Sequence, residues 1–407
     1  MPTATHHPSA EEVAAAERTS MLRQPPAVWA TALASVFAFM GIGLVDPILP
    51  AIAENLDATH SQVSLLFTSY FALTAVMMLV TGWLSSRIGG KRTLLLGLAL
   101  VAVFAALSGT SSTVDQLVGF RAGWGLGNAL FVATALAVIV AVASGGSSVA
   151  IILYEAALGA GLSLGPLLGA VLGGWHWRAP FFGTAVLMTA AFVALLVLLP
   201  DLPRPAQRTR LSDPLRALGH GGLRIVSTSG ALYYYGFFTV LAFVPFVLDA
   251  GPYTIGAVFF GWGLALALTS VFLAPVLQAR WGTARTLVTV LVLLAADLGV
   301  TAAATAGGSR AVVIACTVAA GALLGVNNTL YTELAMEVSD APRPVASAGY
   351  NCVRWMGGVV APYVSTLVAE RAGVAWPFVI AAVVVLVAAG LIGRGARWIG
   401  GHEPAVV

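Results

Sequence analysis

Four charged residues stand inside long apolar stretches of the sequence and are the first candidates for chemistry: Asp46, Arg121, Glu155 and Arg354. A charge in the middle of a bilayer is costly, so such a residue is a functional candidate by default. At about 1.5 Å per helical residue, Asp46 and Arg121 both lie roughly 10 Å below the same membrane surface. We expect a proton-sensitive pair, because arginine favours the carboxylate charge that desolvation disfavours. A permanent structural ion pair is the alternative.

Glu155 and Arg354 lie about 12 Å and 13 Å from the opposite membrane surface by the same count. Glu155 is the second candidate proton carrier, or a hook for a cationic substrate, although a neighbouring helix could simply cap it. Asp297, near the middle of another apolar run, is expected to face a helical neighbour. No histidine falls well inside an apolar run, which excludes a histidine relay.

Aromatic and amide side chains in the same stretches could form a binding pocket for flat, apolar or cationic compounds. For any single one of these residues, ordinary helix packing is the better explanation. Together with Arg354, the predicted substrate-binding residues are Tyr70, Tyr234, Trp262, Asn327, Asn328, Tyr331, Asn351 and Trp355. Tyr233, Tyr235 and Tyr350 belong to the same wider group.

The amino-acid composition indicates that the candidate residues lie on membrane-spanning helices. Of 407 residues, 59% are hydrophobic and 9% charged, and the mean hydropathy is +0.92. These values exclude a soluble enzyme, a disordered protein and a nucleic-acid binder, and they predict a polytopic membrane protein. Twelve apolar runs are long enough to cross a bilayer: 27–53, 62–84, 92–110, 115–142, 147–173, 179–200, 223–248, 253–279, 285–306, 310–336, 345–369 and 374–395.

Polar segments divide these spans into two sets of six. We expect a tail at 1–26, a six-helix bundle at 27–200, a linker at 201–222, a second bundle at 223–395 and a tail at 396–407. With the N-terminus inside, the inner loops and tails hold 15 Lys and Arg residues and the outer loops hold 3. The positive-inside rule therefore predicts that both termini are cytoplasmic.

The two sets of spans share a loop signature that indicates an internal repeat. Residues 87–92 and residues 280–285 both read Arg-x-Gly-x-x-Arg, after the second span of each set. Parallel six-helix repeats are typical of secondary transporters that rock around a central site.

Several motifs resemble the major facilitator superfamily, over the whole chain. The segment from Gly82 through Arg87 and Gly89 to Arg92 is similar to its loop motif, with Ser86 in place of the family aspartate. The fourth span carries an arginine motif from Leu117 to Gly127, with Trp124 at the usual glutamine position. The stretch from Asp46 to Pro50 is similar to the first span of 12-span drug:proton antiporters. The resemblance implies that the loop motif helps to latch the two halves on the cytoplasmic side. Without the aspartate, either this latch is weaker here, or Glu333, Glu337 or Asp340 supplies it.

Glycines spaced by four mark one face of the fifth span: Gly161, Gly165, Gly169 and Gly173. They permit close backbone approach, and Pro166 can bend the helix. Gly161, Gly165, Pro166 and Gly169 are similar to the family's antiporter motif, which implies export. The resemblance also implies that this face limits leakage between the halves.

The combined prediction is an all-α membrane protein of the major facilitator fold, with 12 transmembrane helices in two pseudo-symmetric bundles. Its predicted function is proton-coupled export of small amphipathic or cationic compounds by alternating access. We expect a monomer in the cell membrane that is not an enzyme and has no cofactor, metal or nucleic-acid partner. Its partners would be a small-molecule substrate, protons and the lipid bilayer. A proton-coupled transporter of a sugar or amino acid, and a non-transporting sensor or scaffold, are the alternatives.

Overall fold

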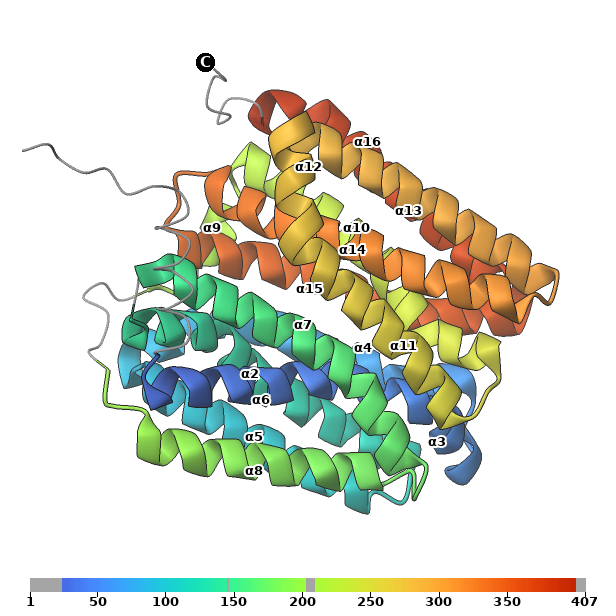
Figure 1. Ribbon diagram of the computed structural model, residues 1–407, viewed down its shortest axis with the longest axis horizontal. Helices are drawn as coiled ribbons and strands as arrows, with labels where there is room; N and C mark the ends of the chain where they lie inside the picture. Colours follow the sequence, from blue (N-terminus) through green and yellow to red (C-terminus); the bar gives the residue numbers. More distant parts are fainter. Residues whose placement is uncertain (1–23, 145, 203–208, 400–407) are drawn as a thin grey trace, which may run out of the picture.

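A computed structural model describes residues 24–144, 146–202 and 209–399, apart from the side chains of 146–149, 151, 152, 155 and 396–399. These residues form helices and no strands. Most helices run along one direction, with the blue-to-green helices grouped below the yellow-green-to-red ones in Figure 1. We call the end of the bundle that carries α9 the linker end, and the opposite end, which carries α3, the α3 end (Figure 1).

The first six spans contain eight helical elements of unequal length. In chain order they are α2 (Pro26–Gly43), η1 (Asp46–Ile48), α3 (Leu49–Asn55), α4 (His60–Ile88), α5 (Gly90–Thr110), α6 (Val114–Val142), α7 (Gly146–Gly173) and α8 (Ala179–Leu198), followed by the short linker helix α9 (Asp213–Ala217).

The last six spans follow the same plan. Their elements are α10 (Gly221–Leu248), α11 (Pro252–Leu268), the π-helical turn η2 (Thr269–Leu273), α12 (Ala274–Trp281), α13 (Thr283–Ala306), α14 (Arg310–Glu337), α15 (Arg343–Ala372) and α16 (Trp376–Ile399).

The structure confirms the predicted fold class, with twelve helices in its described part that are long and apolar enough to cross a membrane. The largest boundary difference is 4 residues: the second span, predicted to end at 84, ends at Ile88, and the last helix, predicted to end at 395, ends at Ile399. The linker prediction missed α9, whose Pro214 carbonyl oxygen lies 2.7 Å from where a Cβ on Gly349 of α15 would stand. The tails and residues 203–208 lie outside the described residues.

Matching glycines terminate the second span of each half. Gly89 separates α4 from α5 with φ 91°, and Gly282 separates α12 from α13 with φ 76°. Side chains are disfavoured at such positive φ values, so glycine allows the sharp reversal between two adjacent helices. The predicted internal repeat therefore corresponds to the same backbone turn in both halves.

The first span is broken in its second half. Residues 44 and 45 form a turn, and Asp46–Ile48 continue as a 3-10 helix before α3 begins. Pro47 and Pro50 both lack the backbone N–H that an α-helix needs, and each ring crowds the preceding turn. The sequence Asp46-Pro-Ile-Leu-Pro50 therefore places Asp46 at an interruption of a membrane helix.

Two helix pairs provide most of the contact between the halves: α4 packs on α15, and α7 packs on α11. Near the α3 end, the Ser64 and Thr366 hydroxyls lie 2.9 Å apart, and the Thr68 hydroxyl donates to the Val359 carbonyl at 2.7 Å. The rings of His60 and Phe246 stack nearby with centroids 4.2 Å apart. The halves are thus joined by polar and stacking contacts at the α3 end.

Candidate functional site

The first charged cluster lies inside the first half and contains Asp46, Arg121, Tyr70 and Trp124. Asp46 and Arg121 are completely buried, at 0% exposure. The break in the first span presents Asp46, while α6 and α4 present Arg121 and Tyr70. The Arg121 guanidinium carbon lies 4.5 Å from the centre of the Tyr70 ring and 4.4 Å from that of Trp124. Two ring faces therefore supply part of the stabilisation that a buried cation loses with its water.

Asp46 and Arg121 do not form a contact ion pair in this conformation. Arg121 Nη1 donates instead to the Gly41 carbonyl at 3.5 Å, and its Nε and Nη2 have no partner among the described residues. Neither carboxylate oxygen of Asp46 has a hydrogen-bond partner there either. The two groups are nevertheless near enough for their charges to interact. The permanent ion pair considered above is therefore not present in this conformation.

The second charged cluster lies in the second half around Arg354 of α15, which is 8% exposed. Its Nη2 donates to Asn351 Oδ1 at 2.7 Å, and its Nη1 donates to Asn328 Oδ1 at 3.2 Å. The hydroxyls of Thr332 and Tyr350 both lie 3.4 Å from Nη1. Each of these neighbours is electrically neutral.

Aromatic rings connect the two charged clusters across the interface of the halves. We call Phe71, Tyr234, Phe238 and Trp355 the aromatic bridge. Phe71 of the first half lies 5.1 Å from Trp355 and 4.2 Å from Phe238, between ring centroids. Tyr234 lies 5.5 Å from Trp355, and its ring faces Arg354 at 4.5 Å. At the other end Phe71 contacts Tyr70 at 5.1 Å. The bridge thus runs from one buried arginine to the other.

Other predicted substrate-binding residues lie beside the aromatic bridge. Trp262 contacts Phe237, which stacks on Tyr234. Tyr331 stacks on Tyr233 and hydrogen-bonds Ser229. Asn327 is fully buried, and neither its oxygen nor its nitrogen has a partner in the described part of the chain. Trp262 and Tyr331 therefore adjoin the aromatic bridge through Phe237 and Tyr233, which both contact Tyr234.

Glu155 lies on α7, but its side chain is outside the described residues. Asp297, expected to face a neighbouring helix, lies on α13, which packs against α14, and its Oδ2 has no hydrogen-bond partner among the described residues. In the described residues, no group of three or more His, Cys, Asp or Glu could hold a metal ion.

The glycine stripe of α7 packs within its own half, which corrects the prediction that it seals the two halves. A Cβ on Gly165 would stand 2.6 Å from the Met40 carbonyl oxygen, and one on Gly169 would stand 2.1 Å from that of Leu44. Both oxygens belong to the first span. Four-residue spacing puts the glycines on one face, but the sequence does not show which helix covers that face.

A neighbouring face of α7 forms the actual contact with the second half. A Cβ on Gly159 would meet the Ala267 Cβ at 2.7 Å, and one on Gly263 would meet Ser163 Cα at 2.7 Å. The Ser163 hydroxyl also lies 3.4 Å from the Phe260 carbonyl of α11. Residues two positions away from the stripe therefore control how closely the halves approach.

Among the described residues, the predicted gating motif forms no ion pair across the two halves. Arg87 places its guanidinium 4.6 Å from the Trp83 ring centre, and Ser86 Oγ donates to the Trp83 carbonyl. Gly82 and Arg92 are exposed. Glu333, one of the proposed substitutes for the missing aspartate, accepts a hydrogen bond from Gln278 of its own half at 3.1 Å. Among the described residues, no carboxylate pairs with Arg87 or Arg92.

Sequence reasoning missed three residues of the site, Phe71, Phe238 and Thr332, and placed Tyr350 only in the wider aromatic group. Helical spacing could have identified Thr332, which follows Asn328 by four residues, just as Tyr350 precedes Arg354 by four. Phe71 and Phe238 carry no such signal, since phenylalanine is common on any membrane-facing or buried helix surface.

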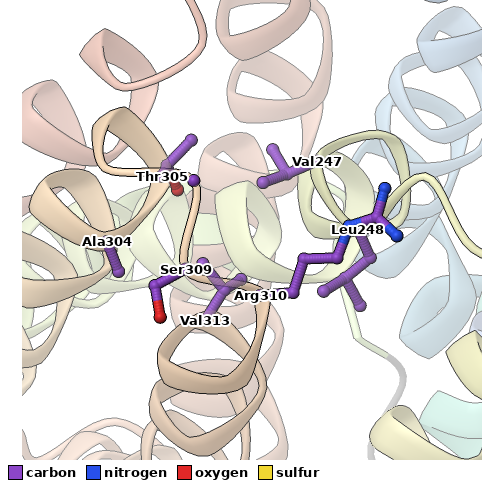
Figure 2. A pocket seen from close by; sticks show the side chains of 8 residues that line it. Val247, Leu248, Ala304, Thr305, Ser309, Arg310 and Val313 are labelled. Carbon is purple, nitrogen blue, oxygen red and sulfur yellow. The ribbon is translucent and has the colours of Figure 1, made fainter.

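A separate small cavity of about 100 Å³ lies at the α3 end, between the end of α10 and the α13–α14 loop (Figure 2). It is lined by Val247, Leu248, Ala304, Thr305, Gly308, Ser309, Arg310 and Val313. Arg310 pairs with Asp249 beside it at 3.6 Å. No residue of either charged cluster lines this cavity, so it is distinct from the candidate site.

Comparisons with known proteins agree with this architecture. The sequence profile of the Major Facilitator Superfamily matches residues 31–341. The multidrug efflux protein YfmO of Bacillus subtilis (strain 168) is 52% identical over 371 residues, which cover 91% of this chain and 93% of that protein. The tetracenomycin C resistance and export protein of Streptomyces glaucescens is 34% identical over 180 residues, which cover 42% of this chain and 33% of that protein.

Solved structures share the fold at low sequence identity. A bacterial homolog of the human lysosomal transporter Spinster superposes with a TM-score of 0.76 at 16% identity, over 94% of this chain and 98% of that chain. The D-xylose-proton symporter superposes with a TM-score of 0.74 at 14% identity, over 90% of this chain and 96% of that chain. The chain therefore belongs to the major facilitator superfamily and is a multi-pass membrane transporter, not an enzyme.

Proposed function

We propose that this protein exports small amphipathic compounds from the cell in exchange for protons, by alternating access. Two kinds of support exist for this proposal. A relative that is 52% identical over nearly the whole chain carries the name multidrug efflux protein. The membrane interior also contains an acidic side chain that could carry a proton and an aromatic cluster that could hold a flat apolar compound.

The environment of Asp46 is the single observation that supports proton coupling most strongly. Asp46 is fully buried, it sits at the break in the first span, and both its oxygens lack a partner among the described residues. A carboxylate without hydrogen bonds is unfavourable in a low-dielectric interior, whereas the protonated form is neutral. Asp46 is therefore suited to bind a proton in this conformation.

Arg121 gives the proton a way to bias the conformation. When Asp46 is deprotonated, its charge attracts the Arg121 guanidinium; when it is protonated, this attraction is lost. The attraction is much stronger in a protein interior than in water. Because Asp46 is on the first span and Arg121 is on α6, the packing of these helices then depends on protonation. A ligand can drive a conformational change only through such a difference between states.

The two contact surfaces between the halves are suited to rocking. Near the α3 end, the Ser64–Thr366 and Thr68–Val359 contacts hold α4 against α15. Opening that end requires these few hydrogen bonds to break. The α7–α11 surface consists largely of small residues such as Gly159 and Gly263, which let two backbones pass closely. The halves can therefore tilt around the buried site.

We propose the linker end as the cytoplasmic end, with both termini inside, because the positively charged loops and the linker gather there. The protein is proposed to act as a monomer, because both charged clusters and the aromatic bridge come from one chain. Residues 27–200 and 223–395 are proposed as the two moving units. No role with nucleic acid is proposed.

Dye export in vesicles with an imposed pH gradient tests the function. Purified protein is reconstituted in liposomes, and the movement of a cationic dye, rhodamine 6G, and of an anionic dye, sulforhodamine B, is followed with and without the gradient. We expect gradient-driven uphill transport by the wild type and none by Asp46→Asn. Equal dye transport by the wild type with and without the pH gradient would contradict proton coupling. No dye transport, together with gradient-driven uptake of a sugar or amino acid, would favour the metabolite transporter instead.

A further inference from the structure

Among the described residues, Arg354 is a buried cation without a buried counter-charge. The charged residues that are buried in the described part of the chain are Asp46, Arg121 and Arg354. Asp46 lies near Arg121, while the described partners of Arg354 are the neutral side chains of Asn328, Thr332, Tyr350 and Asn351. No carboxylate lies within 4.0 Å of Arg354 among the described residues. Within the described part of the chain, no buried carboxylate therefore compensates the positive charge of Arg354 next to the aromatic bridge.

An uncompensated buried cation has a large desolvation cost, which neutral acceptors and ring faces offset only in part. An anion that binds beside Arg354 would remove most of this cost. Because the protein is a transporter, such an anion can be the transported compound itself. Because the empty site leaves a positive charge unbalanced, it should bind negatively charged compounds selectively.

Two unsatisfied N–H donors accompany this charge. Arg354 Nε and the Trp355 indole Nε1 have no hydrogen-bond partner within the described residues, although the two side chains are only 8% and 7% exposed. The Arg354 guanidinium carbon lies 6.0 Å from the Trp355 ring centre. Buried donors normally have an acceptor. A carboxylate or sulfonate has several acceptor oxygens and prefers charge-assisted hydrogen bonds of this kind.

The surroundings of the donors are suited to an apolar ring system. Phe71 and Trp355 stack with their planes 27° apart, and Tyr234 stands edge-on to Trp355 at 86°. A planar aromatic compound could replace the Phe71–Trp355 contact when the halves separate. Its acidic group would then reach Arg354, because Tyr234 contacts both Trp355 and the guanidinium.

We propose that amphipathic organic anions are substrates of this protein: flat aromatic compounds with a carboxylate or sulfonate group that Arg354 binds. This inference rests on the proposed function and names the charge class of its substrates. A lipophilic cation of the same shape gains the ring contacts, but it meets the repulsion of Arg354. The site therefore discriminates by charge between compounds of similar skeleton.

Direct binding of two xanthene dyes tests the proposal: fluorescein, which is anionic at pH 8, and rhodamine 123, which is cationic. Fluorescence polarisation gives a Kd for each dye with purified wild type, Arg354→Gln and Arg354→Lys. Arg371→Gln is the matched control, because Arg371 is exposed on the same helix. We expect Arg354→Gln to weaken fluorescein binding at least tenfold without weakening rhodamine 123. Arg354→Lys should lose less, and Arg371→Gln should match the wild type.

Either of two results would overturn the proposal: wild-type fluorescein binding by a folded Arg354→Gln variant, or equal loss of both dyes. If Arg354→Gln does not fold, Trp355→Phe tests the anion site instead, because it removes the indole N–H donor and keeps an aromatic ring. It should weaken fluorescein binding about threefold and leave rhodamine 123 unchanged; unchanged fluorescein binding would contradict the proposal.

The binding assay requires no transport, so its failure is separate from that of the proposed function. Arg354-dependent fluorescein binding without gradient-driven transport would contradict proton-coupled export and keep the anion site. Gradient-driven rhodamine 6G transport together with Arg354-independent fluorescein binding would contradict the anion site alone.

Discussion

Replacing Gly169 with alanine should disable the transporter through one methyl group. The added Cβ would stand 2.1 Å from the Leu44 carbonyl oxygen, whereas ordinary contacts begin at 3.4 Å. The α7 and first-span backbones must therefore separate by about 1.3 Å at this point. Leu44 lies two residues before Asp46, so the displacement acts on the helix break that positions the proton carrier.

The energetic cost follows from what the methyl meets. Overpacking of a core costs about 1–3 kcal/mol when side chains can adjust. A backbone carbonyl adjusts less than a side chain, so we expect about 3 kcal/mol for Gly169→Ala, at the upper end of that range. Gly165→Ala should cost less, because its Cβ would stand 2.6 Å from the Met40 oxygen. Gly119 of α6 has no atom within 4 Å of its Cβ position and provides the matched control.

The three variants should form a graded series in two measurements. Melting temperature and gradient-driven dye transport should both decrease in the order Gly119→Ala, Gly165→Ala, Gly169→Ala. We expect Gly119→Ala to match the wild type and Gly169→Ala to lose at least tenfold in transport. Normal melting and transport by Gly169→Ala would refute the contact geometry between α7 and the first span.

Three further predictions concern coupling, orientation and the turns that end the second span of each half. Asp46→Asn should abolish uphill transport with little change in melting temperature, because Asp46 has no contact ion pair to lose; gradient-driven transport by this variant would exclude Asp46 as the proton carrier. A cysteine at Ser112 should react with a membrane-impermeant maleimide from outside and one at Leu211 only from the cytoplasm, and the reverse pattern would invert the proposed topology. Gly89→Ala and Gly282→Ala, at φ 91° and φ 76°, should each lower the melting temperature through about 1–3 kcal/mol of backbone strain; melting temperatures equal to the wild type would contradict this turn geometry.

The helices could be predicted from the sequence because each span is a continuous apolar run bounded by polar or turn residues. Thr59 and Thr113 illustrate the boundary signals, since each caps the helix that follows by accepting a backbone N–H three residues later. The break at Asp46 was also readable in principle, because two prolines three residues apart cannot continue a regular helix. Hydropathy alone conceals it, since the residues around the break remain apolar.

Contacts between distant residues were less predictable. Counting residues along the helices predicted that Asp46 and Arg121 lie at the same depth in the membrane. Whether the two charges touch depends on side-chain direction, and Arg121 turns toward Tyr70 and Trp124. Around Arg354, intervals of three and four residues join Asn351 and Tyr350 to one helix face, so half of that cluster follows from periodicity. Its remaining contacts depend on the packing of α15 against α10 and α14, which a single sequence does not specify.

The interrupted first span also has an electrical consequence for Arg121. Gly41, whose carbonyl accepts the Arg121 hydrogen bond, belongs to the last turn of α2, where carbonyls lack helical partners. Aligned peptide dipoles give this end of a helix a partial charge of roughly −0.5. Arg121 therefore meets a fixed, non-titrating counter-charge whether or not Asp46 carries a proton. The cation can stay buried through the whole transport cycle, and the proton on Asp46 only adjusts a charge balance that the backbone already provides.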